Sequence, residues 1–152
     1  MKFAILFSLL INFQMIFSQN LDDFRTLLKS GETSEVATKS LIEKSESSYK
    51  TTKKPIYKGF LAVGKFLMAN HAFNPLKKMS YFNEGKKNLE TAINDDPKNL
   101  ELRLMRLITQ EKIPKILNYH QKIIEDRNFL TKEYHNTSDQ NLKLFIKEYL
   151  KI

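Results

Sequence analysis

Apolar residues recur at helical spacing through most of this chain, and short stretches that contain Gly, Pro or Asn separate the runs. The clearest run lies near the C-terminus and follows the i, i+3, i+4, i+7, i+8 pattern of one helical face. It consists of Leu142, Phe145, Ile146, Tyr149 and Leu150. With only 4 Gly and 4 Pro in 152 residues, the composition argues against a β-sandwich, a barrel or a linker-rich chain. The sequence therefore predicts an all-α array of antiparallel hairpins, with about five to seven helices.

Residues that start and stop helices predict where the individual helices lie. The predicted caps are Asn20, Asn74, Asp96 and Ser138, and the second and third of these each precede a Pro. The predicted helices span 21–30, 33–50, 55–70, 75–93, 98–111, 115–135 and about 139–150, the sixth being the longest. The third helix is apolar on most sides, so we expect it at the centre. Gly59 and Gly64 inside it predict the close approach of neighbouring helices.

Residues 1–18 have the features of a secretory signal peptide. Lys2 supplies a positive charge, residues 3–11 form an apolar run, and Ser18 is a small residue at the predicted cleavage point. The run is shorter than the roughly 20 apolar residues of a membrane helix. We therefore expect an exported protein with one helical domain over 19–152, the alternative being an uncleaved anchor. Because the chain has no Cys, its stability must come from core packing.

Positive charge is concentrated in one segment. The formal net charge is +8, and residues 50–87 hold nine Lys but a single acid, Glu84. Such a segment can form a basic surface that binds an anionic lipid, lipopolysaccharide or an acidic partner. Alternatively, its lysines only solvate helix surfaces. The candidate basic surface consists of Lys53, Lys54, Lys58, Lys77, Lys78, Lys86 and Lys87.

The helix predicted over 98–111 has an informative distribution of charge. Arg103, Arg106 and Gln110 fall within a narrow arc, whereas Glu101 lies on the apolar side, where an unpaired carboxylate is costly. Antiparallel packing on the next helix predicts a network that pairs Glu101 with Arg127 and brings Arg103 or Arg106 to Tyr119, His120 or Asp126. This network either fixes the register of the hairpin or leaves an arginine-lined groove for an anionic ligand or a peptide carboxylate. The candidate binding residues are Arg103, Arg106, Gln110 and Tyr119, and the candidate structural ion-pair residues are Glu101, Asp126 and Arg127.

No motif of a known catalytic or cofactor site occurs in the sequence. P-loop, GxGxxG, GxSxG and HExxH patterns are all absent. His120 and His135 lack the spacing of metal ligands, so we expect no metal and no other cofactor. The aromatic residues of the basic segment recur at helical spacing, which is typical of core packing rather than base stacking, and we expect no nucleic-acid partner. These patterns argue against an enzyme.

Residues 85–103 resemble the junction between two tetratricopeptide repeats. Gly85, Leu89, Ala92 and Pro97 have the small–large–small–Pro spacing of the second helix of such a repeat and the turn after it. This resemblance implies a tetratricopeptide-like array, in which the small residues admit the paired helix and Pro97 starts the next one. The chain as a whole is similar to small exported helical proteins of unknown function from Bacteroidota, through the segment NLELRLMRLITQEKIPKILNYHQKIIEDR.

Together, these features predict a monomeric, exported binding or scaffolding module that mediates protein–protein interaction in the periplasm or cell envelope. The alternative is a protein that binds an anionic lipid or polysaccharide of the envelope through its lysine-rich surface. An adaptor should expose an apolar or mixed concave patch, whereas a binder of anionic surfaces should lose its ligand in salt. An enzyme of unknown type is a minor alternative.

Overall fold

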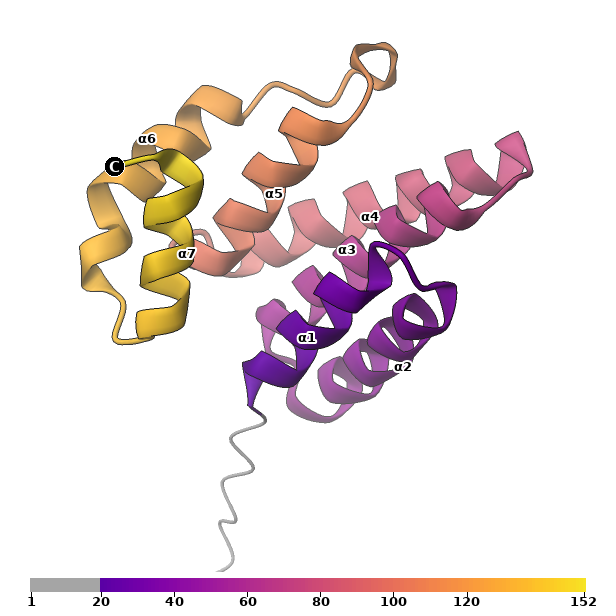
Figure 1. The fold of residues 1–152 in the computed structure, drawn as a ribbon, viewed down its shortest axis with the longest axis horizontal. Coiled ribbons are helices and arrows are strands. Elements are labelled where there is room, and N and C mark those ends of the chain that lie inside the picture. The colour runs from indigo at the N-terminus through magenta and orange to yellow at the C-terminus, as the bar shows by residue number, and fades with distance from the viewer. Residues whose placement is uncertain (1–19) are drawn as a thin grey trace, which may run out of the picture.

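The computed structural model describes residues 20–152, which form seven α-helices and two short 3₁₀ helices (Figure 1). This part of the chain contains no β-strand, so the predicted all-α class is confirmed. The helices are α1 (Leu21–Gly31), α2 (Glu35–Thr52), α3 (Pro55–His71), α4 (Pro75–Asp95), α5 (Leu100–Lys112), η1 (Lys115–Leu117), α6 (Ile123–Glu133), η2 (Tyr134–Asn136) and α7 (Gln140–Leu150). The predicted signal peptide lies outside the described residues.

Short polar side chains cap most of the helices. Asn20 and Asn74 accept hydrogen bonds from first-turn N–H groups of α1 and α4, as predicted. The other two predicted caps are wrong. Asn99, three residues after Asp96, caps α5 by accepting from the Leu102 N–H at 3.1 Å. Asp139, rather than Ser138, caps α7.

The helix predicted over 115–135 is interrupted. Residues 115–117 form η1, Asn118 adopts a left-handed conformation with φ 47°, and α6 begins only at Ile123. The interruption has a packing reason, because it turns Tyr119 into the core beside Phe66 and Phe82. The longest helix of the described part is therefore α4, with 21 residues.

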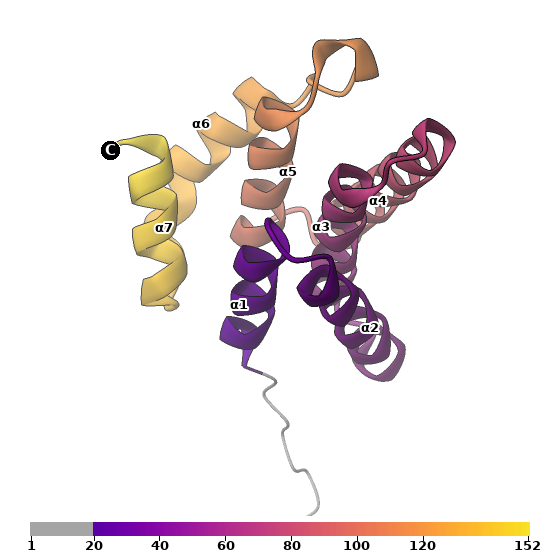
Figure 2. The ribbon, with the colours of Figure 1, turned by 45° about the vertical axis from the view of Figure 1, so that its right-hand side comes forward.

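Two hydrophobic clusters form the core, and α5 contributes to both. The larger joins α1–α5 and includes the fully buried Phe24, Phe60 and Leu102. The smaller joins α5, α6 and α7 around Leu107 and Ile146. Because α3 packs against its neighbours on both sides and against α5, the predicted central place of this helix is confirmed (Figure 2).

Glycines mark the closest helix contacts, as predicted for Gly59 and Gly64. A Cβ added at Gly59 would lie 2.2 Å from a methyl carbon of Leu102 on α5, and one at Gly64 would lie 2.7 Å from Ile42 on α2. Gly85 also lies close to α3, where an added Cβ would lie 3.0 Å from the Ala62 carbonyl oxygen. The absence of a side chain at these three positions therefore allows three helix pairs to approach at their present distances.

Candidate functional site

The fully buried Asp126 of α6 lies between two arginines of α5. Its Oδ2 accepts a hydrogen bond from Arg106 Nε at 2.7 Å, and its Oδ1 accepts one from Arg106 Nη2 at 2.8 Å. Arg103 Nε lies 2.5 Å from the same Oδ1. The predicted approach of these arginines to Asp126 is therefore confirmed, and the paired hydrogen bonds to Arg106 are the strongest form of this contact.

Glu90 connects α4 to this group of charged residues on α5 and α6. Its Oε2 accepts from Arg106 Nη1 at 2.8 Å, and its Oε1 accepts from the Tyr119 hydroxyl at 2.5 Å. Burial raises the pKa of Tyr119 above its ordinary value, and the hydrogen bond to Glu90 raises it further. Sequence reasoning brought Arg106 near Tyr119 but missed Glu90, because nothing in the sequence shows which face of α4 meets α5. We call Arg103, Arg106, Asp126, Glu125 and Glu90 the Asp126 network.

All three nitrogens of the Arg106 guanidinium are bound to carboxylates of the chain itself. Burial alone would lower the pKa of Arg106, but the hydrogen bonds and negative charges of Asp126 and Glu90 together outweigh it, so the pKa is raised above its ordinary value. Arg103 is also occupied, since its Nη2 donates to Glu125 Oε1 at 3.0 Å and its guanidinium lies 4.7 Å from the Phe129 ring centre. Both side chains are thus paired with carboxylates of the chain itself, Arg103 with Glu125 and Asp126 of α6 and Arg106 with Asp126 and with Glu90 of α4.

The structure brings the four candidate binding residues together but buries them. Arg103 is 8% exposed, and the other three, Arg106, Gln110 and Tyr119, are 3% exposed or less. Gln110 Oε1 accepts from the backbone N–H of Lys122 at 3.0 Å, which ties α5 to the start of α6. This geometry is that of a network that fixes the register of the α5–α6 hairpin. An open arginine-lined groove is not present at these residues.

The predicted Glu101–Arg127 ion pair is wrong. Glu101 accepts two hydrogen bonds at 2.8 Å from Arg25 of α1. The interruption between α5 and α6 shifts the hairpin register, so that Arg127 lies level with a more C-terminal part of α5 than predicted. Arg127 instead pairs with Glu111, whose other carboxylate oxygen accepts from the Tyr149 hydroxyl of α7.

Arg25 joins the starts of three helices that are far apart in the sequence. Besides Glu101 at the start of α5, it donates to Asp22 in α1 at 2.9 Å and to the α7 cap Asp139 at 2.7 Å. The hydrogen bonds to Glu101 raise the pKa of Arg25 above its ordinary value. We call Arg25, Asp22, Glu101 and Asp139 the Arg25 cluster. It shows that α1, α5 and α7 begin at the same end of the molecule (Figure 1).

A groove of about 600 Å³ runs between α1, α3, α5 and α7. Its lining residues all belong to these four helices, apart from Glu32, which directly follows α1. Apolar side chains form most of its surface, and we call it the interhelical groove. Its lining residues are Arg25, Leu28, Lys29, Glu32, Phe60, Val63, Glu101, Leu104, Met105, Ile108, Thr109, Lys112, Asn141, Leu142, Phe145 and Tyr149.

Four of the five charged residues of the interhelical groove lie in pairs at its two ends, and the fifth, Lys29, is in the last turn of α1, close in sequence to Glu32. Arg25 and Glu101 are at the end where α1, α5 and α7 begin, and they are hydrogen-bonded to each other. Glu32 and Lys112 are at the end where α1 and α5 finish, with 3.7 Å between their charged atoms. The middle is therefore apolar, and Phe145 remains 51% exposed there. An apolar surface that stays open to solvent between four helices is typical of a binding site.

Comparison with known proteins assigns no family to this chain. No family model, curated protein or solved structure matches it. Between residues 20 and 152 there is no group of three His, Asp or Glu side chains that could hold a metal ion. In the same part of the chain, no helix combines the length and apolar character needed to cross a membrane.

A second cavity of about 580 Å³ lies beyond the Arg25 cluster. It shares Glu101 and Leu142 with the interhelical groove, so the two spaces adjoin. More of its lining is polar, including Asn99, Glu133 and Asp139. Two of these polar side chains are helix caps already bonded to backbone N–H groups. Since its polar groups already serve the fold, we place the candidate site in the interhelical groove.

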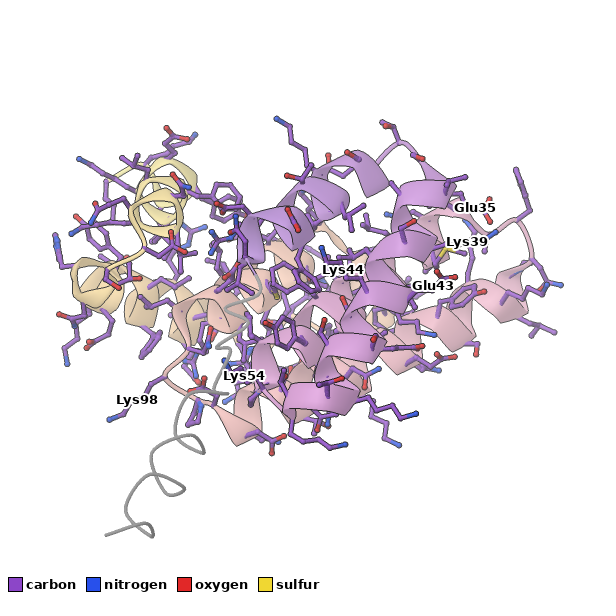
Figure 3. The ribbon with its side chains drawn as sticks, turned by 90° about the horizontal axis from the view of Figure 1, so that it is seen from below. Glu35, Lys39, Glu43, Lys44, Lys54 and Lys98 are labelled. Atoms are coloured by element: carbon purple, nitrogen blue, oxygen red, sulfur yellow. The ribbon has the colours of Figure 1, made fainter. Side chains whose placement is uncertain are left out.

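The seven lysines of the candidate basic surface do not form one continuous patch. Lys53, Lys54 and Lys58 lie at the start of α3, and two of them sit over the Tyr49 ring. Lys77 and Lys78 begin α4, beyond the other end of α3, which is about 25 Å long. Figure 3 shows Lys54 at one end of α2 and the labelled Glu35 and Lys39 towards its other end. The remaining two, Lys86 and Lys87, lie midway along α4.

Proposed function

We propose that this protein is an exported helical interaction module of the cell envelope, and that it binds an apolar or amphipathic segment of a partner protein in the interhelical groove. The observation that supports this most strongly is the open apolar middle of the groove. A soluble helical domain normally covers such a surface, and one that stays open marks an interaction site. The leader-like sequence of residues 1–18 supports the envelope location.

The groove chemistry favours a peptide segment over a small polar ligand. Small-molecule sites usually combine an apolar pocket with a few free polar groups that orient the ligand. Here four of the five charged lining residues are paired within the chain, Arg25 by hydrogen bonds to Glu101 and Glu32 with Lys112. The space also follows α5 for nearly its whole length, from Glu101 to Lys112. This shape suits apolar side chains repeated along an extended or helical partner segment, as in helix-in-groove recognition.

The proposal includes no catalytic step and no cofactor. Catalysis by acid–base groups needs titratable side chains that are free to exchange a proton with a substrate. Along the groove, Glu101 is held by Arg25, and the Tyr149 hydroxyl donates to Glu111. Burial and the bond to Glu111 raise the pKa of Tyr149 above its ordinary value, so this hydroxyl stays protonated at neutral pH. We therefore propose a binding role. The resemblance of residues 85–103 to a tetratricopeptide repeat agrees with such a role.

Two neighbouring residues of α7 provide a matched test. Phe145 and Leu144 are 51% and 57% exposed, but only Phe145 lines the groove. Three tagged proteins are compared: the wild type, Phe145→Glu and Leu144→Glu. Each is used to capture partners from solubilised cell envelope, with washes at low and high salt. We expect the wild type and Leu144→Glu to retain the same protein in high salt and Phe145→Glu to lose it at least tenfold, since burial of a Phe is worth about 1.5–3 kcal/mol. Equal retention by the two variants would contradict the proposal.

A further inference from the structure

The α3–α4 turn presents apolar side chains that no part of the described chain covers. Phe73 is 99% exposed, Leu76 is 82% exposed, and Met79 is 46% exposed. The turn is at the far end of the α3–α4 hairpin, where it projects away from α5, α6 and α7 (Figure 1). We call residues 72–79 the hairpin tip. Phe73 and Leu76 are two of the three most exposed large apolar side chains of the described residues, and they lie three residues apart on this one projecting turn. Apolar side chains that cluster on a surface, rather than occurring singly, indicate an interaction site.

Local hydrogen bonds hold the hairpin tip in this conformation. Asn74 Oδ1 accepts from the N–H groups of Leu76 and Lys77 at 2.8 and 3.3 Å, and Pro75 is the first residue of α4. On the other side of the turn, His71 Nε2 lies 2.7 Å from the Gly31 carbonyl oxygen at the end of α1. The tip is thus fixed by a capped helix start and by a contact to a second helix. The backbone that carries the exposed apolar side chains is therefore held in one conformation by hydrogen bonds.

The charge around the hairpin tip is positive. Residues 47–83 contain no Asp or Glu, and within the described chain neither Lys77 nor Lys78 has a carboxylate within 4.0 Å. Two acids of the adjoining helices are engaged elsewhere, since Glu35 at the start of α2 pairs with Lys39 and Glu84 further along α4 pairs with Lys65. The tip therefore combines solvent-exposed Phe and Leu side chains with two unneutralised lysines.

We propose that the hairpin tip is a membrane-surface anchor, which places Phe73 and Leu76 among the headgroups of an anionic bilayer while Lys77 and Lys78 contact lipid phosphates. Exposed aromatic and aliphatic side chains flanked by lysines are the combination that binds such an interface. Each Lys near an anionic surface adds about fivefold to the affinity. Insertion of Phe73 and Leu76 contributes the part of the affinity that does not depend on salt concentration.

The shape of the hairpin tip favours a lipid surface over a protein partner. Protein hot spots are usually side chains that enter a well-packed pocket or concave patch. The tip is a projecting turn, and none of Phe73, Leu76 and Met79 lines either cavity. A projecting apolar turn can insert between lipid headgroups, because lipids move aside and no complementary pocket is needed. Because the interhelical groove lies on other residues, this anchor is independent of the groove and would place an open groove beside the membrane.

The absence of Trp from the chain provides a local reporter of this contact. Phe73→Trp places a single indole at the tip, and Ile116→Trp places one in η1, at a side chain that is 90% exposed. The chain from Gln19 onward is mixed with vesicles of phosphatidylcholine alone or of equal parts phosphatidylcholine and phosphatidylglycerol. We expect the emission of Phe73→Trp to shift to shorter wavelength only with the anionic vesicles, and that of Ile116→Trp to stay unchanged with both.

Vesicle flotation separates the roles of the apolar and the charged residues. Relative to wild type, we expect Phe73→Ser with Leu76→Ser to weaken binding at least tenfold, and Lys77→Gln with Lys78→Gln to weaken it about twenty-five-fold at low salt. Lys132→Gln with Lys151→Gln, on other exposed helix ends, serves as the charge control. If the emission wavelength of Phe73→Trp shifts with protein concentration when no vesicles are present, the hairpin tip mediates self-association. That result would overturn the proposal, as would equal shifts of the two Trp variants or no shift with anionic vesicles.

Discussion

At the scale of single residues, the most informative feature is a carboxylate buried with two guanidinium groups. Asp126 has no exposed surface, and its two oxygens are shared by Arg103 and Arg106. A buried ion pair of this kind adds little net stability compared with an apolar contact, but removing one partner leaves uncompensated charge. Asp126 therefore matters to the fold mainly because it fixes how α6 sits on α5.

Substitution of Asp126 should be far more costly than substitution of its neighbour. We expect Asp126→Asn to lower the free energy of unfolding by about 3–5 kcal/mol, because two arginines lose the charge that neutralises them. Glu125→Gln should cost less than about 1 kcal/mol, since the Glu125 side chain is 47% exposed although it also binds Arg103. Urea unfolding of the two variants checks this. Similar losses for both would mean that Asp126 is not the centre of the network.

At the scale of elements, sequence predicts helix identity better than helix ends. The pair Asn74-Pro75 marks the start of α4 correctly because cap and first helical residue are both local signals. Asp96-Pro97 has the same local pattern, yet α5 starts after Asn99, where the Asn99 side chain reaches back to Asp96 at 2.9 Å. The interruption before α6 depends on the burial of Tyr119 against α3 and α4, which local sequence does not contain.

The cap of α5 provides a prediction at this scale. We expect Asn99→Ala to lower the free energy of unfolding by about 1 kcal/mol, because the Leu102 N–H loses its acceptor. Asn94→Ala is the control, since Asn94 is exposed near the end of α4 and caps no helix. Thermal or urea unfolding measures both. A loss for Asn94→Ala as large as that for Asn99→Ala would argue against the observed start of α5.

At the scale of the whole molecule, hydrogen bonds between residues far apart in the sequence join the N-terminal helix α1 to α5 and α7. Arg25 and Glu101 are 76 residues apart, and Asp139 is 114 residues from Arg25. Sequence reasoning recognised that Glu101 needed a cation but chose Arg127, on the helix expected to pack antiparallel to it. Only the three-dimensional arrangement, in which Arg25 of α1 reaches Glu101 of α5, shows the actual partner. The same arrangement creates the interhelical groove, which for this reason was expected only as a general concave patch.

The Arg25 cluster should make stability depend on pH in the acid range. Burial alone would raise the pKa of Asp139, but the Leu142 N–H and Arg25 hold it below its ordinary value. Such a carboxylate stabilises the fold above its unfolded pKa of about 3.9, and this contribution is lost as the pH falls through the lower folded pKa. We expect Asp139→Asn, which keeps an N-cap side chain, to be about 1 kcal/mol less stable than wild type at pH 6, and this difference to shrink as the pH falls below the unfolded pKa of about 3.9. Asp95→Asn, at an exposed position, should show no such convergence.

The central claim, that the interhelical groove binds a partner protein, is tested most directly by crosslinking in intact cells. A photoreactive phenylalanine analogue is placed at position 145, within the groove, or at position 144, on the neighbouring exposed face of α7. We expect irradiation to give one discrete protein adduct from position 145 and none from position 144. Adducts of the same kind from both positions, or none from position 145, would contradict a partner in the groove.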